Sequence, residues 1–89
     1  MLERDIEKYL VAEVRKRGGE AYKFTSPAMR GVADRLVVMP GAVWFVELKR
    51  PGGKRTPLQE RFALRMQELG QRYALLSHPT EVERWLAQL

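Results

Sequence analysis

The sequence predicts a single α/β domain in which a mixed four-stranded sheet is flanked by helices, in the order αβββαβα. Three observations predict it. Apolar residues recur with helical spacing in two segments, two β-rich runs flank Pro40-Gly41, and 89 residues leave room for one domain. Hydrophobic residues make up 45% of the chain and charged residues 30%, which is typical of globular proteins. We therefore expect residues 1–89 to form one domain.

The N-terminal third is expected to hold a helix and a strand. Apolar side chains recur at helical spacing over residues 3–17, and Gly18-Gly19 ends the pattern. The members of this stripe are Leu2, Ile6, Tyr9, Leu10 and Val14. Residues 21–25 alternate in character and carry aromatic side chains, which is typical of a strand, and residues 26–31 form a loop.

The middle of the chain is expected to form a hairpin. Residues 34–39 and 43–48 are rich in β-branched and aromatic side chains, and Pro40-Gly41 separates them with a turn signal. The second run is almost continuously apolar as far as Glu47, as in a strand that is covered on both faces. A basic, glycine-rich loop follows over residues 50–55.

The C-terminal part is expected to alternate helix, strand and helix. Thr56 is placed to cap a second helix that has Pro57 in its first turn and Gly70 after its end. The apolar side of this helix should consist of Leu58, Phe62, Leu64, Met66 and Leu69. Residues 72–76 form the fourth strand, and a capping box over residues 80–83 opens the last helix. Its inward side chains should be Val82, Trp85, Leu86 and Leu89.

Composition excludes several classes of function. The chain has no cysteine and a single histidine, His78, which excludes a disulfide framework, a thiol nucleophile and a Cys/His zinc site. His78 is expected to be a loop residue without a catalytic role. The apolar runs are far shorter than the ~20 residues of a membrane span, and the charged N-terminus is unlike a signal peptide. These features predict a soluble cytoplasmic protein with no small-molecule cofactor.

The charge distribution indicates a polyanionic partner. Sixteen Lys and Arg residues against eleven Asp and Glu give a net charge of +5. Residues 49–65 contain six of the cations and one acid, so this segment alone carries the equivalent of the whole net charge. Such a concentrated patch fits nucleic acid better than a scattered excess would. The alternative is a basic protein whose charge only keeps it in solution.

Two acidic side chains are expected to meet within the hairpin. Side chains alternate along a strand, so Glu47 and Lys49 share one side while Leu48 points to the core. If the hairpin loop has an even number of residues, Asp34 lies directly opposite Glu47, with the Cβ atoms about 4.5–5.5 Å apart. An odd loop would shift the register and separate the carboxylates.

Adjacent carboxylates repel each other unless a cation lies between them. Mg²⁺ is the natural candidate because it prefers oxygen ligands and is often held by one or two carboxylates with water and phosphate oxygens. Lys49 can reach a scissile phosphate or the attacking water. These parts suit hydrolysis of a phosphodiester. The alternative is that Glu47 and Lys49 only form a weak ion pair on a solvent-facing strand.

Three segments together resemble the PD-(D/E)xK nuclease superfamily: Gly31-Val32-Ala33-Asp34, Glu47-Leu48-Lys49 and Gln59. Within that superfamily the chain resembles the compact stand-alone form of the virus-type replication-repair nuclease (VRR-NUC) domain. The likeness covers essentially the whole chain and extends to archaeal Holliday junction resolvases. It implies a restriction-endonuclease-like fold. One departure is Ala33, where the family usually has a proline that stiffens the backbone, and we expect activity to be retained.

The resemblance also implies roles for particular residues. Asp34, Glu47 and the Leu48 carbonyl would hold Mg²⁺ or Mn²⁺, and Lys49 would assist the nucleophile. Gln59 would act near Lys49; the alternative is an exposed polar residue in the first turn of a helix. The expected DNA contacts are Lys23, Ser26, Arg50, Lys54 and Arg55, of which the first two could equally be ordinary surface residues.

Helical geometry distinguishes the acids of the first helix. At about 100° per residue, Glu3 falls within the apolar stripe, and Glu7 falls on its margin, where a carboxylate can bend into solvent. Glu13 also faces inward but lies nearly three turns further along. We therefore expect Glu3 to point into the protein and serve the site, and the segment Glu3-Arg4-Asp5-Ile6 resembles the family motif for this acid. The alternative is an N-terminal acid that only favours the helix dipole.

These features favour a Mg²⁺- or Mn²⁺-dependent DNA endonuclease. The resemblance implies branched or junction DNA as substrate, a homodimer with two active sites on opposed strands, and a bacterial or phage-infected host cytoplasm. The rival is a non-catalytic basic DNA-binding module on the same fold. The intact set of Asp34, Glu47 and Lys49 argues against it, because buried charges without a use are costly. A purely structural basic protein would leave the carboxylate pair unexplained.

Overall fold

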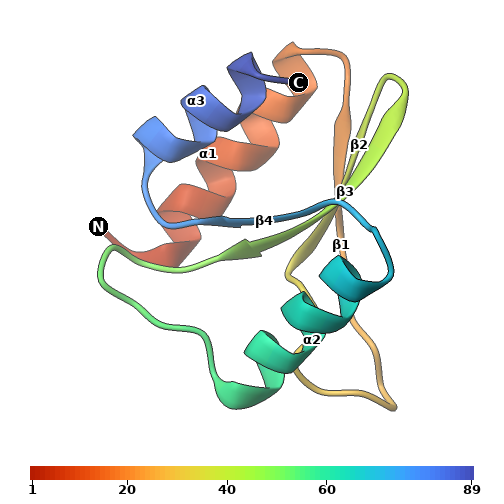
Figure 1. Ribbon diagram of the computed structural model, residues 1–89. Helices are drawn as coiled ribbons and strands as arrows, with labels where there is room; N and C mark the ends of the chain where they lie inside the picture. Colours follow the sequence, from red (N-terminus) through yellow and green to blue (C-terminus); the bar gives the residue numbers. More distant parts are fainter.

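A central sheet carries two helices on one face and one helix on the other. The computed structural model describes residues 1–89. Its helices are α1 (Glu3–Lys16), α2 (Pro57–Glu68) and α3 (Pro79–Ala87), and its strands are β1 (Glu20–Lys23), β2 (Arg35–Met39), β3 (Ala42–Leu48) and β4 (Tyr73–Leu76). Helices α1 and α3 lie side by side on one face, and α2 lies on the opposite face (Figure 1). The predicted order αβββαβα is confirmed.

The sheet is mixed, as predicted, with the strand order β1-β2-β3-β4. The pairs β1–β2 and β2–β3 are antiparallel, and β3–β4 is parallel. Met39 pairs with Ala42, so the hairpin loop consists of Pro40 and Gly41 and has an even number of residues. The predicted pairing of β2 with β3 across an even-numbered loop is therefore confirmed over the pairs from Arg35–Val46 to Met39–Ala42.

The main core lies between the sheet and the pair α1–α3. Its fully buried members include Ile6, Leu10, Val14, Val37, Val46, Leu48 and Val82. Trp85 of α3 packs edge-to-face on Trp44 of β3, with ring centroids 5.3 Å apart. Burial of these apolar side chains is the main favourable term in folding, so this layer forms the rigid base of the sheet.

The α2 face of the sheet is packed more lightly. Phe45 and Phe62 meet with ring centroids 5.7 Å apart, and Phe24 and Tyr73 extend this aromatic cluster. Ala63 is the one buried residue of α2. The expectation that Leu58, Leu64 and Leu69 pack inward is wrong, because all three are exposed. A single helix on this face has no neighbouring helix to cover its flanks.

Both ends of the last helix differ from the prediction. The N-cap of α3 is His78, whose Nδ1 accepts a hydrogen bond from the N–H of Thr80, so the capping box predicted over residues 80–83 is wrong. Glu81 accepts hydrogen bonds from the N–H and hydroxyl of Ser77 instead. At the other end, Leu89 is exposed, because α3 ends at Ala87. None of the three helices has the length and apolar character needed to cross a bilayer.

Gly31 brings the loop before β2 into direct contact with the first turn of α2. Its φ angle is +82°, and a Cβ atom placed there would lie 2.6 Å from the carbonyl carbon and oxygen of Leu58. Only glycine fits both the left-handed backbone and this close approach. Gly31 therefore couples the segment that leads into Asp34 to the helix that carries Gln59.

We predict that Gly31→Ala lowers the free energy of unfolding by about 2–5 kcal/mol. About 1–2 kcal/mol comes from the left-handed backbone and a further 1–3 kcal/mol from overpacking against Leu58. Gly41→Ala is the matched control, because Gly41 has the same φ of +82° and no atom within 4 Å of its added Cβ. Urea denaturation of both variants measures the difference. Equal losses would show that the contact with Leu58 contributes nothing.

Candidate active site

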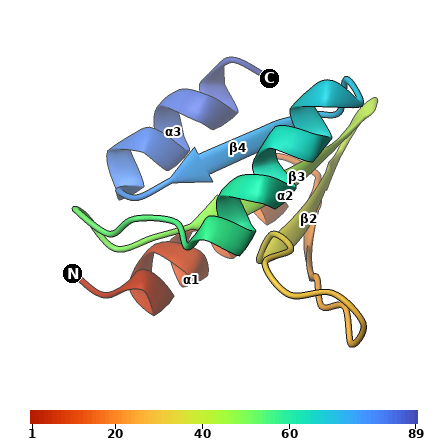
Figure 2. The ribbon, with the colours of Figure 1, turned by 60° about the horizontal axis from the view of Figure 1, so that its bottom comes forward.

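Asp34 and Glu47 come together where β2 begins and β3 ends. The Asp34 N–H donates to the Val46 carbonyl at 3.1 Å, directly beyond Arg35–Val46, the last pair of the β2–β3 ladder. Asp34 Oδ2 accepts a hydrogen bond of 2.8 Å from the Leu48 N–H. Because Gln59 of α2 donates to Glu47, the carboxyl group of Glu47 lies on the face of the sheet that carries α2. Figure 2 shows α2 lying across this face.

Glu47 is the one buried charged residue of the chain, with 1% of its surface exposed. Its Oε2 accepts a hydrogen bond from Gln59 Nε2 at 3.1 Å and lies 3.6 Å from Lys49 Nζ. Its Oε1 is buried and has no hydrogen-bond partner. Such an oxygen is costly to leave unsatisfied, and it could accept a cation or a hydrogen-bond donor.

Burial raises the pKa of Glu47 to about 8, and the neighbouring charge of Asp34 acts in the same direction. Lys49 opposes this shift, and Glu3 adds slightly to it. Two neighbouring carboxyl groups in a shielded place cannot both ionise cheaply, so one of them retains a proton at neutral pH. A bound cation would replace that proton.

Gln59 is held in place by the start of α2. Thr56 Oγ1 accepts a hydrogen bond from the Gln59 N–H at 3.2 Å, and Gln59 Oε1 accepts one from the Thr56 N–H at 2.9 Å. This capping box begins the helix at the position that the sequence predicts. The Gln59 amide group thus uses its oxygen for the cap and its nitrogen for Glu47, which excludes the alternative of a free surface side chain.

Lys49 lies one residue beyond β3 and shares the side of Glu47. Its N–H donates to the Leu76 carbonyl at 3.1 Å, which holds its backbone in line with the strand. The side chain is largely shielded from solvent. The structure therefore brings four of the expected site residues together: Asp34, Glu47, Lys49 and Gln59.

The first turn of α1 differs from the prediction. Glu3 is exposed rather than buried, because burial on this helix begins only at Ile6 and Leu2 is exposed as well. The pKa of Glu3 is nevertheless raised, by partial burial of its carboxyl group and then by the charge of Asp34. Glu3 is thus close enough to the carboxylate pair to respond to its charge.

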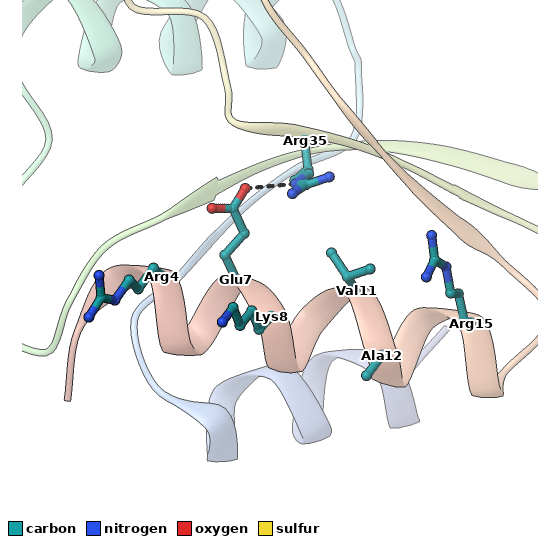
Figure 3. A pocket seen from close by; sticks show the side chains of 7 residues that line it. All are labelled: Arg4, Glu7, Lys8, Val11, Ala12, Arg15 and Arg35. Atoms are coloured by element: carbon teal, nitrogen blue, oxygen red, sulfur yellow. Dashed lines mark hydrogen bonds and ion pairs between the residues drawn. The ribbon is translucent and has the colours of Figure 1, made fainter.

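Glu7 does not bend into solvent as expected. Its Oε2 lies 2.7 Å from Nε of Arg35, the first residue of β2 (Figure 3). The Arg35 Nη1 also donates to the Ala21 carbonyl at 3.0 Å. The sequence analysis missed Arg35, although a charged side chain within an apolar strand was a signal that it needed a partner.

The expected DNA contacts are dispersed. Arg50 and Lys54 are exposed on the loop that follows Lys49. Arg55 is half-buried, with its guanidinium 5.8 Å from the centre of the Tyr73 ring and 3.5 Å from the Tyr73 hydroxyl. The structure therefore leaves two free cations on this loop.

Lys23 and Ser26 lie apart from the carboxylate pair. Lys23 pairs with Arg35 across β1 and β2, so strand alternation turns it to the face opposite Asp34. Ser26 is half-buried in the loop before β2 and makes no side-chain hydrogen bond. The structure brings neither residue into contact with Asp34 or Glu47.

The donor atoms fit a hard divalent cation. Asp34 and Glu47 offer carboxylate oxygens, of which the orphaned Oε1 of Glu47 is already desolvated. The Leu48 carbonyl lies on the same edge of β3 as the Leu48 N–H, which donates to Asp34. No group of three Asp, Glu, His or Cys side chains forms a metal cluster. A cation would therefore complete its shell with water and substrate oxygens, as Mg²⁺ usually does.

A mixed sheet with an acid at the start of one strand and Glu-x-Lys at the end of its neighbour has the architecture of the PD-(D/E)xK nucleases. The sequence is 56% identical over 75 residues to "Putative nuclease p44" of Acyrthosiphon pisum secondary endosymbiont phage 1, covering 83% of this chain and 81% of that protein. The fold is similar to a solved structure described as a VRR_NUC domain, with a TM-score of 0.90 and 28% identity over 96% of this chain and 94% of that one. No family model matches the sequence.

The chain belongs to the VRR_NUC family. Both comparisons support a nuclease, and the predicted resemblance and fold class are confirmed.

We predict that Glu47→Gln stabilises the metal-free protein at alkaline pH. Because the pKa of Glu47 is raised from 4.5 to about 8, the folded state keeps a proton that the unfolded state releases between these values. Stability of the wild type should therefore fall as pH rises through this range. A glutamine mimics the protonated carboxyl group and removes that loss.

Thermal unfolding in EDTA at pH 5.5 and pH 8.5 measures this effect. The Tm advantage of Glu47→Gln should be small at pH 5.5 and several degrees larger at pH 8.5, since about 1 kcal/mol corresponds to 4–8 °C in a domain of this size. An advantage that is the same at both pH values would contradict the assigned pKa.

Proposed function

We propose that the chain is a divalent-metal-dependent endonuclease that hydrolyses phosphodiester bonds in DNA. The observation that carries this proposal is the shielded pair of Asp34 and Glu47, with an unsatisfied Glu47 oxygen, beside Lys49. Structural proteins have no use for such a pair, because it costs stability without a cation. The VRR_NUC fold and the phage relative support the assignment.

Each side chain has a role that follows from its place. Asp34, Glu47 and the Leu48 carbonyl would hold Mg²⁺ or Mn²⁺, which when bound polarises a phosphate and lowers the pKa of a bound water. Lys49 donates a hydrogen bond to the attacking water or to a phosphate oxygen. Gln59 keeps the Glu47 carboxylate oriented through its amide nitrogen. Glu3 would serve the metal held by Asp34 and Glu47 from the edge of the site, directly or through a water molecule.

The DNA backbone is proposed to lie along the loop after β3. Arg50 and Lys54 are exposed there, next in the chain to Lys49, and can neutralise phosphates on either side of the cut. Lys23 and Ser26 would contact phosphate only where the DNA extends past the end of the sheet. A domain of this size has little surface with which to read the base sequence. We therefore propose that it recognises the shape and the phosphates of the DNA backbone.

Branched DNA, such as a Holliday junction or a flap, is the proposed substrate. The resemblance to junction resolvases supports it, and the phage relative fits a role in replication, recombination or repair within a bacterial or phage-infected cytoplasm.

A homodimer is the proposed assembly. Tyr22, Val38 and Val43 are exposed, and the strand register puts them on the same face of the sheet as Phe45, which packs on Phe62 of α2. Their register places Val38 directly opposite Val43, so the apolar side chains adjoin one another. A two-fold contact between two such faces would bury them and add to a modest core.

We predict that cleavage requires both metal and Lys49. Labelled four-way junction, flap, splayed and linear duplex DNA should stay intact in EDTA, and Mg²⁺ or Mn²⁺ should restore cutting, with the branched forms cut fastest. Lys49→Ala should lower kcat at least a hundredfold while DNA binding persists, because the lost interaction acts mainly in the transition state.

Lys16→Ala is the matched control, since Lys16 pairs with Glu13 at the far end of α1. If the wild type binds DNA but cuts none of the four DNA forms under any metal condition, the rival function, a non-catalytic DNA-binding module, is supported. Full cleavage by Lys49→Ala would refute the assigned role of this lysine.

We predict that sedimentation equilibrium gives about twice the chain mass of 10.3 kDa. Val43→Asp should produce a monomer, because it places a charge in the proposed contact. Leu89→Asp is the control, since Leu89 is similarly exposed (47% against 46%) but lies at the C-terminus. A monomeric wild type that cuts flaps but spares four-way junctions would refute the resolvase-like assembly and leave the nuclease intact.

A further inference from the structure

An ion pair joins the first helix to the sheet directly behind the carboxylate pair. Glu7 Oε2 and Arg35 Nε are 2.7 Å apart, with only 22% and 19% of their side chains exposed (Figure 3). The Arg35 Nη1 also donates to the Ala21 carbonyl of β1 at 3.0 Å. One guanidinium therefore fastens α1, β1 and β2 together.

This pair differs from the other ion pairs of α1. Arg15–Glu20 and Lys16–Glu13 each involve a largely exposed cation, and such surface pairs contribute little to stability. Glu7–Arg35 is the best shielded of the pairs that α1 makes with another part of the chain. Shielded charge pairs fix geometry more reliably than they add stability, because desolvation offsets their attraction.

The position of the pair in the chain connects it to the site. Arg35 directly follows Asp34, and Glu7 lies one helical turn after Glu3 on the same face of α1. Residues 1–5 are all exposed, and burial begins at Ile6. The first turn of α1 therefore has little packing of its own to hold it, and Glu7–Arg35 is the nearest polar link between it and the sheet.

We propose that Glu7 and Arg35 form a positioning pair that holds the first turn of α1, and with it Glu3, beside Asp34 and Glu47. The proposed role of both residues is structural: the Arg35 guanidinium uses Nε for Glu7 and Nη1 for the Ala21 carbonyl, and neither residue is assigned a contact with the substrate. The expected effect of this ion pair on cleavage rests on the proposed nuclease function.

The test compares Glu7→Gln, Arg35→Gln and the double variant with wild type. Each single change should lower kcat about tenfold or more at nearly unchanged KM, as loss of a group that orients site residues typically does. The double variant should be no worse than either single one, because both remove the same contact. Arg35→Lys should recover part of the loss, since it retains the charge but cannot bond both partners.

Hydrogen exchange in the metal-free protein supplies a readout that is independent of cleavage. The Ile6 N–H, which donates to the Leu2 carbonyl, should exchange at least several times faster in both single variants. The Gly19 N–H, which donates to Val14 at the other end of the helix, should be unchanged. Glu13→Gln is the matched control, because it removes the pairs with Lys16 and Arg17 and should alter neither cleavage nor Ile6 exchange.

Three results would overturn the inference. One is a loss of cleavage no greater than that of Glu13→Gln. A second is that Glu7→Gln and Arg35→Gln raise KM and leave kcat unchanged, and that substitution of Lys8 does the same. That result would assign DNA binding to the groove of about 430 Å³ that Arg4, Lys8 and Arg15 line. A third is inactivation by Glu7→Gln but not by Arg35→Gln, which would make Glu7 a catalytic acid. If the wild type cuts no DNA, the proposed function fails. Hydrogen exchange of the Ile6 N–H in the Glu7→Gln and Arg35→Gln variants would still test whether the ion pair holds the first turn of α1.

Discussion

The confinement of two carboxyl groups at the ends of neighbouring strands is the constraint on which the rest of the structure depends. Asp34 and Glu47 cannot move apart, because the β2–β3 ladder and the Leu48 N–H hold them. Shielding from water makes their mutual repulsion expensive and leaves one of them protonated at neutral pH. The surrounding groups moderate this cost: Gln59 and Lys49 both reach the same oxygen of Glu47.

The two faces of the sheet serve different purposes. The face toward α1 and α3 carries the apolar core, which fixes the backbone of β2 and β3 and hence the spacing of the carboxyl groups. The other face carries the site and a lightly packed α2, whose first turn delivers Gln59. Gly31 and the Thr56 cap locate that turn. The rigid strands and the located first turn of α2 thus hold the groups of the site in fixed positions.

Much of the fold and the centre of the site could be predicted from the sequence, for physical reasons. Strand side chains have a period of two, so a two-residue turn was enough to predict that Asp34 and Glu47 lie near each other at the end of the hairpin. Thr56 and Gln59 match a capping box, which set the start of α2. The second hydrogen bond of Gln59, to Glu47, depends on how α2 docks and is not encoded in local sequence.

The errors share a cause. Helical phase gives the direction of a side chain but not the point along the axis where packing begins, so Glu3 was expected inside and Glu7 outside. The partner of Glu7 is Arg35, 28 residues away, and only tertiary structure reveals that pairing. Leu58 and Leu64 were placed inward because apolar spacing does not show that α2 lacks a neighbouring helix.

The central claim is that the paired carboxyl groups form a cation site, and calorimetric titration with Mn²⁺ tests it most directly. Measurements at pH 7 in two buffers of different ionisation enthalpy give the number of protons released on binding. Because the pKa of Glu47 is about 8, binding should release close to one proton, and Glu47→Gln should abolish that release. Mn²⁺ binding without proton release, or binding that survives in the combined Asp34→Asn and Glu47→Gln variant, would contradict the claim.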